Sequence, residues 1–307
     1  MFCDSLLSSK AILPSYVFLL LSSQDIMIEI VKCARVESQK TKKFEVSVVS
    51  RLFSRRLLLM LMALLLVVPL GWQLRFSTEL VCAGMPTVER RLNNKTVSYI
   101  ETTLDSLTSQ LNQSDMDQIL IIVLLADEQR PPREKIRAML SNRYRKLIDR
   151  NFLHLIEAPS NYYPPLTGLP RNFGDTPKRV HWRSKQAMDF VFLMQYCSGL
   201  AENFLVLEDD LKTDGNFLSA IKNCLNLHKG LDWVHLRFSI WMSFGKFYRE
   251  SALTNLARYL RMLYFESPWD LLVDKYHKRL RPDDMAYYCG QVFKHIGNHS
   301  SSRNTES

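Results

Sequence analysis

Three consecutive acids, Glu208, Asp209 and Asp210, come directly after the apolar run 204–207, and a fourth acid, Asp127, closes an earlier apolar run. In α/β proteins, ligands bind in the crevice that the loops form beyond the carboxyl ends of the strands. Hard divalent cations such as Mn²⁺ and Mg²⁺ prefer carboxylate oxygens and keep other positions for water and substrate phosphates. Taken alone, an acidic triplet is more often a solvated turn or a helix N-terminus. The preceding strand, the order of elements and the topology described below favour a site for a cation that bridges to a diphosphate.

The elements that must position these acids alternate along the chain in a regular order. Apolar runs predict strands at residues 80–84, 118–126, 152–156, 204–207 and 233–238. Apolar residues at helical spacing predict helices at residues 99–111, 133–150, 183–198 and 216–227. Nearly continuous apolar strands are buried on both faces, as in parallel sheets. The order predicts an α/β doubly wound core with a mostly parallel sheet in a single domain.

A charge-free stretch lies between the N-terminal tail and this domain. Residues 57–74 form 18 uncharged positions, at the short end of the ~17 to 25 residues that span a bilayer. Residues 1–56 carry nine Lys/Arg against five Asp/Glu, which is +4 of the net +9 of the chain. The positive-inside rule therefore predicts a single-pass type II protein: residues 1–56 form a cytoplasmic tail, 57–74 a transmembrane signal anchor and 75–80 a short stem. The alternative for 57–74 is a buried core helix.

A second, shorter apolar run at residues 11–21 complicates the N-terminus. It resembles the apolar part of a signal peptide, but no small-residue cleavage site follows it. Eleven residues do not span a bilayer unaided. The run is either a feature of a long tail, the mark of an alternative start or a cleaved leader.

Composition excludes several classes of protein. The 307 residues are 47% hydrophobic and 23% charged, with 10 Gly and 12 Pro, so collagen-like, low-complexity and wholly disordered chains are excluded. The basic excess is partly a topology signal. A nucleic-acid partner is not expected, because no basic face with interleaved aromatic residues is found.

Two further features fit an expected lumenal location beyond residue 75. Three glycosylation sequons lie there, at Asn94, Asn112 and Asn298. Four cysteines also lie there: Cys82, Cys197, Cys224 and Cys289. An even number permits three disulfide pairings in an oxidising compartment, and buried free thiols are the alternative.

Five blocks carry a family resemblance, in this order: APSNYYP at 158–164, RVHWRSKQ at 179–186, LEDD at 207–210, NFLSAIK at 216–222 and HIGNHSS at 295–301. From about residue 81 to 301 the chain resembles the N-acetylglucosaminyltransferase IV family, Golgi enzymes that add a β1,4-linked GlcNAc to the α1,3-mannose arm of N-glycans. The resemblance implies a GT-A-like domain at 81–301, followed by a polar tail at 302–307. It also implies UDP-GlcNAc as donor, a divalent cation and inversion at the anomeric carbon.

The resemblance assigns roles at the donor side of the site. Asp209 and Asp210 take the place of the family's acidic metal motif, with Glu208 beside them on the donor side. Asp127 corresponds to a position suited to hydrogen-bonding the uridine. His295 is a candidate third metal ligand, although a lone histidine is more often structural. A cation held here neutralises the charge that builds on the departing UDP.

The remaining roles are the base and the contacts to the diphosphate. Asp270 matches an acid of the family and is the candidate base for the attacking sugar hydroxyl; the alternative is that it caps a helix. Arg183 and Lys185 either meet the donor diphosphate or form a solvated helix face. The expected partners are an N-glycan acceptor on glycoproteins, the membrane, and other Golgi glycosyltransferases in a homo- or hetero-oligomer.

Departures from the family pattern leave two function classes open. Arg237 stands where the family has Glu, and the segment 288–293 lacks a basic residue and has Cys289 in its place. From the resemblance we also expect no counterpart of the C-terminal accessory domain that several members carry. An intact acidic motif favours an active Golgi N-acetylglucosaminyltransferase. The departures favour a non-catalytic relative that regulates another Golgi glycosyltransferase by association.

Overall fold

The computed structural model describes residues 79–92, 95–240, 244–280 and 286–298. They belong to one compact unit of the chain, which runs from residue 77 to 307. The expected cytoplasmic tail, signal anchor and polar tail, the apolar run 11–21, most of the stem and the sequon at Asn94 lie outside the described residues. Within the described ranges, no helix is both long and apolar enough to cross a membrane.

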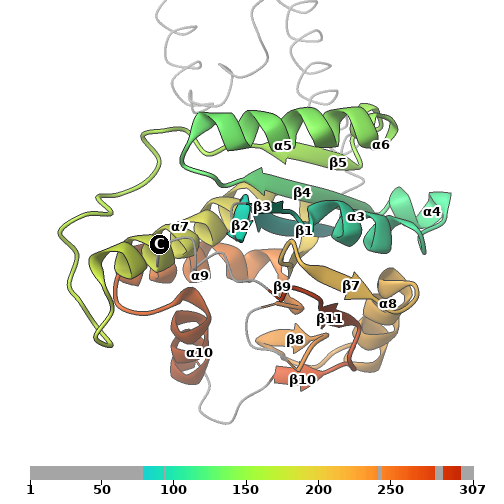
Figure 1. Ribbon diagram of the computed structural model, residues 1–307. Helices are drawn as coiled ribbons and strands as arrows, with labels where there is room; N and C mark the ends of the chain where they lie inside the picture. The colour runs from blue at the N-terminus through green and yellow to red at the C-terminus, as the bar shows by residue number, and fades with distance from the viewer. Residues whose placement is uncertain (1–78, 93–94, 241–243, 281–285, 299–307) are drawn as a thin grey trace, which may run out of the picture. The chain divides into compact units, whose positions relative to one another are not determined.

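The described residues form short and long strands that alternate with helices (Figure 1). The strands are β1 (Glu79–Thr87), β2 (Arg90–Leu92), β3 (Lys95–Val97), β4 (Ile119–Leu125), β5 (Leu153–Ile156), β6 (Ala201–Val206), β7 (Leu211–Thr213), β8 (His235–Arg237), β9 (Lys246–Arg249), β10 (Ala286–Tyr288) and β11 (Phe293–His295). The helices are α3 (Ile100–Thr108), α4 (Gln113–Met116), α5 (Arg130–Arg143), α6 (Arg145–Asp149), α7 (Pro177–Cys197), α8 (Phe217–Leu227), α9 (Glu250–Leu263) and α10 (Trp269–Leu280).

A seven-stranded sheet in the order β10-β8-β9-β6-β1-β4-β5 forms the centre of the domain. Every neighbouring pair is parallel except the two pairs that involve β9. All seven residues of β4 are buried, as expected for a parallel strand covered on both faces. The prediction of an α/β fold with a mostly parallel sheet is confirmed.

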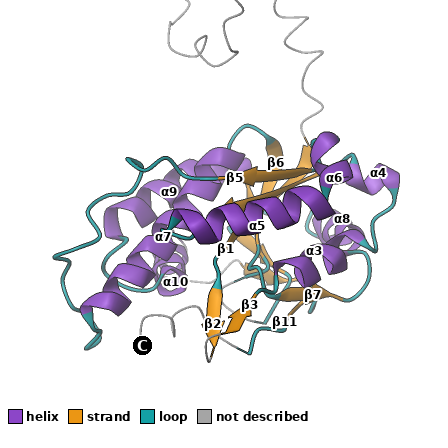
Figure 2. Ribbon diagram, turned by 45° about the horizontal axis from the view of Figure 1, so that its top comes forward, coloured by secondary structure: helices purple, strands orange, loops and turns teal. Residues whose placement is uncertain are grey.

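Helices cover both faces of the sheet and build two hydrophobic cores. One core contains side chains of α3, α5 and α8, and the other contains side chains of α7, α9 and α10. In Figure 2, α7, α9 and α10 group on the left, and α3, α4 and α8 group on the right. Two small antiparallel ribbons, β7–β11 and β2–β3, lie outside the main sheet.

Two helices differ from their expected bounds for local reasons. The expected helix 133–150 is divided at Tyr144, which lies outside the helical region at φ −108° and ψ 23° and separates α5 from α6. Helix α7 begins at Pro177, six residues before its expected start. The side chain of Thr176 caps it by accepting a hydrogen bond from the Arg179 amide at 3.2 Å. Proline suits a first helical position because its missing N–H has no partner there in any case.

Four cysteines of the described residues form two disulfides. Cys82 of β1 is joined to Cys197 at the end of α7, and Cys224 of α8 is joined to Cys289, which follows β10. Of the three pairings that the sequence left open, the structure has this one, and it excludes the alternative of free thiols.

Candidate functional site

The acids meet where the order of the sheet reverses, at the carboxyl ends of β1 and β6. Strand β4 pairs with one edge of β1, and strand β6, which comes later in the chain, pairs with the other edge. Such a switch point is where open α/β sheets bind ligands. Thr87, the last residue of β1, donates a hydrogen bond to Asp209 Oδ2 at 2.6 Å. Residues 208–210 are here called the acidic turn. Thr103 of α3 donates a hydrogen bond to the Asp209 carbonyl at 2.8 Å, which fixes the backbone of this turn.

Arg90 supplies a buried positive charge to this turn. Its guanidinium donates to Asp209 Oδ1 and Oδ2 at 2.5 and 2.9 Å, and to Asp210 Oδ2 at 3.2 Å. Burial disfavours the charged guanidinium, but the adjacent Asp209 and Asp210 outweigh this effect and raise the pKa of Arg90. Sequence reasoning missed Arg90. The one signal was its position just beyond β1, but the strand was expected to end at residue 84, three residues before its actual end at Thr87.

Asp210, Glu208 and His295 form the group best suited to a cation. Their ligand atoms all lie within 4.8 Å of one another, and His295 Nε2 is 3.2 Å from Asp210 Oδ2. Asp210 Oδ1 is buried and has no hydrogen-bond partner, which is an unfavourable state for a carboxylate oxygen. Burial, and next the Asp209 charge, raise the pKa of Asp210, while Arg90 and His295 oppose the rise. An unpartnered buried oxygen beside an imidazole and a second carboxylate fits a divalent cation.

His295 reaches this group through the β7–β11 ribbon. It lies opposite Leu211, which directly follows Asp210, and the Ile296 amide donates to the Asp210 carbonyl at 2.9 Å. Gly297 lies against the Asp210 carboxylate so closely that a Cβ atom there would collide with it. The β7–β11 ribbon therefore holds residues 295–297 against the acidic turn.

Asp127 lies at the same edge of the sheet, beyond β4. Its carboxylate oxygens accept from the Glu89 amide at 3.0 and 3.2 Å, and the Ala126 amide donates to the Thr87 carbonyl at 2.9 Å. Burial is the main cause that raises the pKa of Asp127. Its expected role toward the uridine stays a prediction.

Lys185 and Arg183 are both buried, so the alternative of a solvated helix face is wrong for these two side chains. Lys185 Nζ donates to both oxygens of Asp189 at 2.9 Å and to the Ala126 carbonyl at 2.5 Å, beside Asp127. Arg183 donates to Asp175 Oδ2 and to the Phe265 carbonyl, each at 2.9 Å. Lys185 thus lies near the site, and the contacts of Arg183 join α7 to two loops. Their contact with a diphosphate stays a prediction.

Asp270 lies in the first turn of α10, half-buried, and accepts a hydrogen bond from the Leu271 amide at 2.9 Å. Helix α10 packs against α7 and α9. The role of Asp270 as the base stays a prediction.

The second half of the carboxyl edge is positive. Arg237 at the end of β8 lies directly opposite Lys246 of β9 and next to Tyr288 of β10. Lys246 is buried, and Arg237 Nε is buried without a partner. On the same face, the imidazoles of His235 and His277 stack at 4.0 Å. Burial is the main cause that lowers the pKa of His235 to about 2 and of His277 to about 3, so both are neutral near pH 7.

The asparagines of two of the three sequons lie in the described residues. Asn112 is exposed and caps α4 by accepting a hydrogen bond from the Asp115 amide at 2.9 Å. Asn298 is exposed next to the site, and its amide donates to the Tyr99 hydroxyl at 3.3 Å. Both side chains lie where an attached glycan meets solvent, and their modification stays a prediction.

Comparison with known proteins gives a consistent result. The family model described as the MGAT4 conserved region matches residues 60–307. Alpha-1,3-mannosyl-glycoprotein 4-beta-N-acetylglucosaminyltransferase C of Danio rerio is 35% identical over 236 residues, which are 77% of this chain and 51% of that relative. The A form from Xenopus tropicalis is 32% identical over 235 residues, with 72% and 43% covered. The chain spans about half the length of these curated relatives.

Solved structures are less similar. The 4-diphosphocytidyl-2C-methyl-D-erythritol synthase from Anaerococcus prevotii aligns with 75% of this chain and 95% of its own, with a TM-score of 0.42 and 10% identity. A similarity this low carries no argument. The family model and the sequence identities are sufficient by themselves: the chain belongs to the family defined by the MGAT4 conserved region.

Proposed function

We propose that this protein is an N-acetylglucosaminyltransferase with a GT-A-like domain. It transfers GlcNAc from UDP-GlcNAc to a mannose of N-glycans, forming a β1,4 branch with inversion, and depends on a divalent cation. One observation carries the proposal: Glu208, Asp210 and His295 meet at the switch point of the sheet, with Asp210 Oδ1 buried and unpartnered. The names of the relatives support the donor sugar and the acceptor mannose.

The residues of the site divide the work of the reaction. Asp210, His295 and Glu208 would hold Mn²⁺ or Mg²⁺, which supplies Lewis-acid stabilisation of the charge on the departing diphosphate. Arg90 holds Asp209 and Asp210 in place by its hydrogen bonds to both, and its charge opposes the rise in the pKa of Asp210. The remaining steps fall to other acids of the chain.

Asp127 accepts from the uridine, and Asp270 takes the proton of the attacking hydroxyl. Lys185 lies close enough to the Ala126–Asp127 turn to add positive charge near the donor. Proton transfer to a positioned carboxylate contributes typically ~10² to 10⁴-fold to a rate.

We further propose a Golgi membrane location, with a single type II span at 57–74 and the described domain in the lumen. Two disulfides support an oxidising compartment, since cytosolic proteins rarely keep structural disulfides. Association with other Golgi glycosyltransferases is part of the same proposal.

A non-catalytic regulator of another Golgi glycosyltransferase is the second candidate. The observation that favours it is the positive pair Arg237 and Lys246 at the edge of β8 and β9. Arginine cannot serve as a base at neutral pH and repels a cation. This reading keeps the fold and the acidic turn but requires no turnover.

Transfer of GlcNAc by the full chain tests the choice. The assay uses UDP-GlcNAc and a biantennary N-glycan acceptor, with Mn²⁺ or with chelator, for the wild type and Asp210→Asn. We expect Mn²⁺-dependent product that falls by about 10² or more in Asp210→Asn. Asp149→Asn is the matched control, because Asp149 lies exposed on α6 and pairs only loosely with Arg145 at 3.7 Å. Folded wild-type protein that binds UDP but forms no product would support the regulator instead.

A further inference from the structure

The segment 286–298, here called the strap, joins the two halves of the site edge. It begins as β10, paired with β8, and ends as β11, paired with β7. Its last residues carry His295 and Gly297 to Asp210. The position of His295 therefore depends on what holds the strap upstream.

Backbone hydrogen bonds hold the middle of the strap to the end of β8. The Cys289 amide donates to the Arg237 carbonyl at 2.8 Å, and the Val292 amide donates to the Phe238 carbonyl at 2.9 Å. Phe293 is fully buried against Phe217 of α8, with ring centroids 5.7 Å apart. The strap thus rests on α8 as well as on the sheet.

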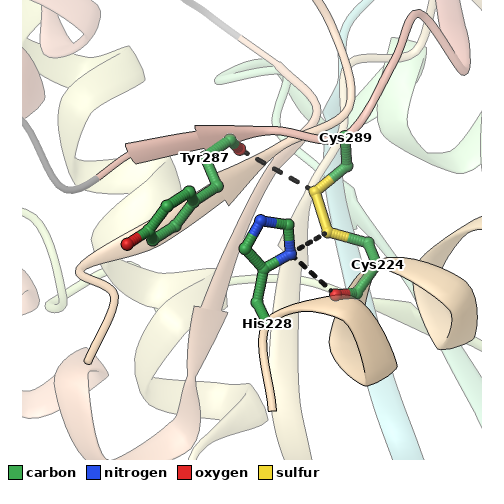
Figure 3. The surroundings of a disulfide bond; sticks show 4 residues. All are labelled: Cys224, His228, Tyr287 and Cys289. Atoms are coloured by element: carbon green, nitrogen blue, oxygen red, sulfur yellow. Dashed lines mark hydrogen bonds between the residues drawn. A yellow bond between two sulfur atoms is a disulfide. The ribbon is translucent and has the colours of Figure 1, made fainter. Parts of the chain in front are cut away.

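The disulfide between Cys224 and Cys289 makes the contact with α8 covalent (Figure 3). His228, at the end of the helix, lies beside it, with Nδ1 3.5 Å from Cys224 Sγ and donating to the Cys224 carbonyl at 2.8 Å. The Tyr287 ring lies 4.4 Å from the imidazole. Cys289 is only half-buried, so this disulfide lies closer to solvent than the disulfide between the buried Cys82 and Cys197.

The crosslink closes a ring around the acidic turn. From Asp210 the chain passes through β7 into α8, crosses the disulfide to Cys289, and returns along β11 to His295, which contacts Asp210. A crosslink limits the local opening of the segments that it joins. A site populated only part of the time in its competent form binds its ligand more weakly by that fraction.

We propose that the Cys224–Cys289 disulfide is a positioning crosslink for His295, so that the cation affinity of the Glu208–Asp210–His295 group depends on it. This inference rests on the cation site of the proposed function. The disulfide between Cys82 and Cys197 provides the matched comparison, because it joins β1 to the end of α7 and lies away from the strap. Its removal acts on stability without moving His295.

Mn²⁺ binding to the full chain tests the inference by calorimetric titration. We expect the double variant Cys224→Ser with Cys289→Ser to lower the affinity for Mn²⁺ about 10-fold, as is typical when a group that orients a metal ligand is lost. The double variant Cys82→Ser with Cys197→Ser should keep the wild-type affinity within about twofold while unfolding more easily. Hydrogen exchange should increase at residues 291–297 in the first double variant and not in the second.

A chemical route avoids variants that do not fold. Mild phosphine reduction of the wild type, with the reduced pair identified by mass mapping, should weaken Mn²⁺ when Cys224–Cys289 opens, and reoxidation should restore the affinity. Unchanged affinity after that opening overturns the positioning role while the cation site stands. Folded wild-type protein that binds no Mn²⁺ overturns the cation site and, with it, this inference.

Discussion

The two halves of the carboxyl edge of the sheet bury opposite charges. Beyond β1 and β6, Asp209 and Asp210 are gathered around Arg90, and beyond β4 the Asp127 carboxylate accepts from the Glu89 amide. At the end of β8 and the start of β9, Arg237 and Lys246 face each other across the strands. One sheet edge thus presents a candidate cation site beside the positive pair of Arg237 and Lys246.

The halves differ in how burial is made tolerable. In the acidic half, the buried guanidinium of Arg90 and the hydroxyl of Thr87 donate hydrogen bonds to the Asp209 carboxylate. In the positive half, the two imidazoles give up their charge, since their pKa values lie far below the ordinary value of 6.5. The acidic half thus pairs buried carboxylates with a buried guanidinium, whereas in the positive half burial keeps the imidazoles neutral, so additional charge is poorly tolerated there.

Removal of the Arg90 charge should cause the largest loss in the free energy of unfolding. Arg90→Met leaves Asp209 and Asp210 buried without their cation, and loss of one partner of a buried ion pair costs about 3 to 5 kcal/mol. Urea unfolding measures the loss. The control is Arg150→Met, whose pair with Asp117 at 3.5 Å is exposed and should change stability by less than about 1 kcal/mol. Equal effects of the two substitutions would contradict the prediction.

Acid should break the positive half. His235 and His277 have folded-state pKa values below the unfolded value, so the unfolded chain binds protons first and stability falls as the pH drops below about 6.5. At pH 5 each imidazole accounts for about 2 kcal/mol of this loss. The stability difference between pH 7.5 and pH 5 should therefore shrink by about that amount in His235→Phe, which keeps the stacked ring without a titrating group. An unchanged difference would show that the imidazoles do not remain neutral.

Substitution of Gly297 should sharpen the view that the ribbon holds the acidic half in place. In Gly297→Ala the new Cβ collides with the Asp210 carboxylate, so either the strap or the carboxylate must shift. We expect Mn²⁺ affinity to fall by about 10-fold through displacement of His295. Gly199→Ala is the control: Gly199 lies outside the strap and has φ +78°, which strains an alanine, but no atom lies within 4 Å of its Cβ position. An equal or greater loss of affinity in Gly199→Ala would contradict the role of Gly297.

The acidic half was the more predictable of the two from sequence, because its signals are local. The continuous apolar run of β4 and the acids that directly follow β4 and β6 place carboxylates at one edge by chain order alone. His295 belonged to a recognisable block of the family. The mostly parallel sheet followed from the alternation of strands and helices along the chain.

What sequence could not supply was set by long-range pairing. Arg90 meets Asp209 across 119 residues, and no local pattern connects the two. The strands β7, β10 and β11 have three residues each, too few for a periodic signal, and they exist because distant segments pair. Arg183 and Lys185 look like a solvated helix face until Asp175 and Asp189 are brought against them.

A charge reversal at Arg237 gives the smallest expected effect and the finest test of the contrast. Arg237→Glu places a carboxylate opposite Lys246, and an opposite-charge cross-strand pair is worth about 0.2 to 1 kcal/mol. We expect a small gain in the free energy of unfolding. Arg237→Gln should lie between the wild type and Arg237→Glu, because it removes the repulsion from Lys246 without adding an attraction. A loss in Arg237→Glu would mean that this edge of the sheet requires positive charge, which would favour the regulator over the enzyme. A gain that brings Mn²⁺-dependent transfer with it would instead identify Arg237 as the residue that limits catalysis in this chain.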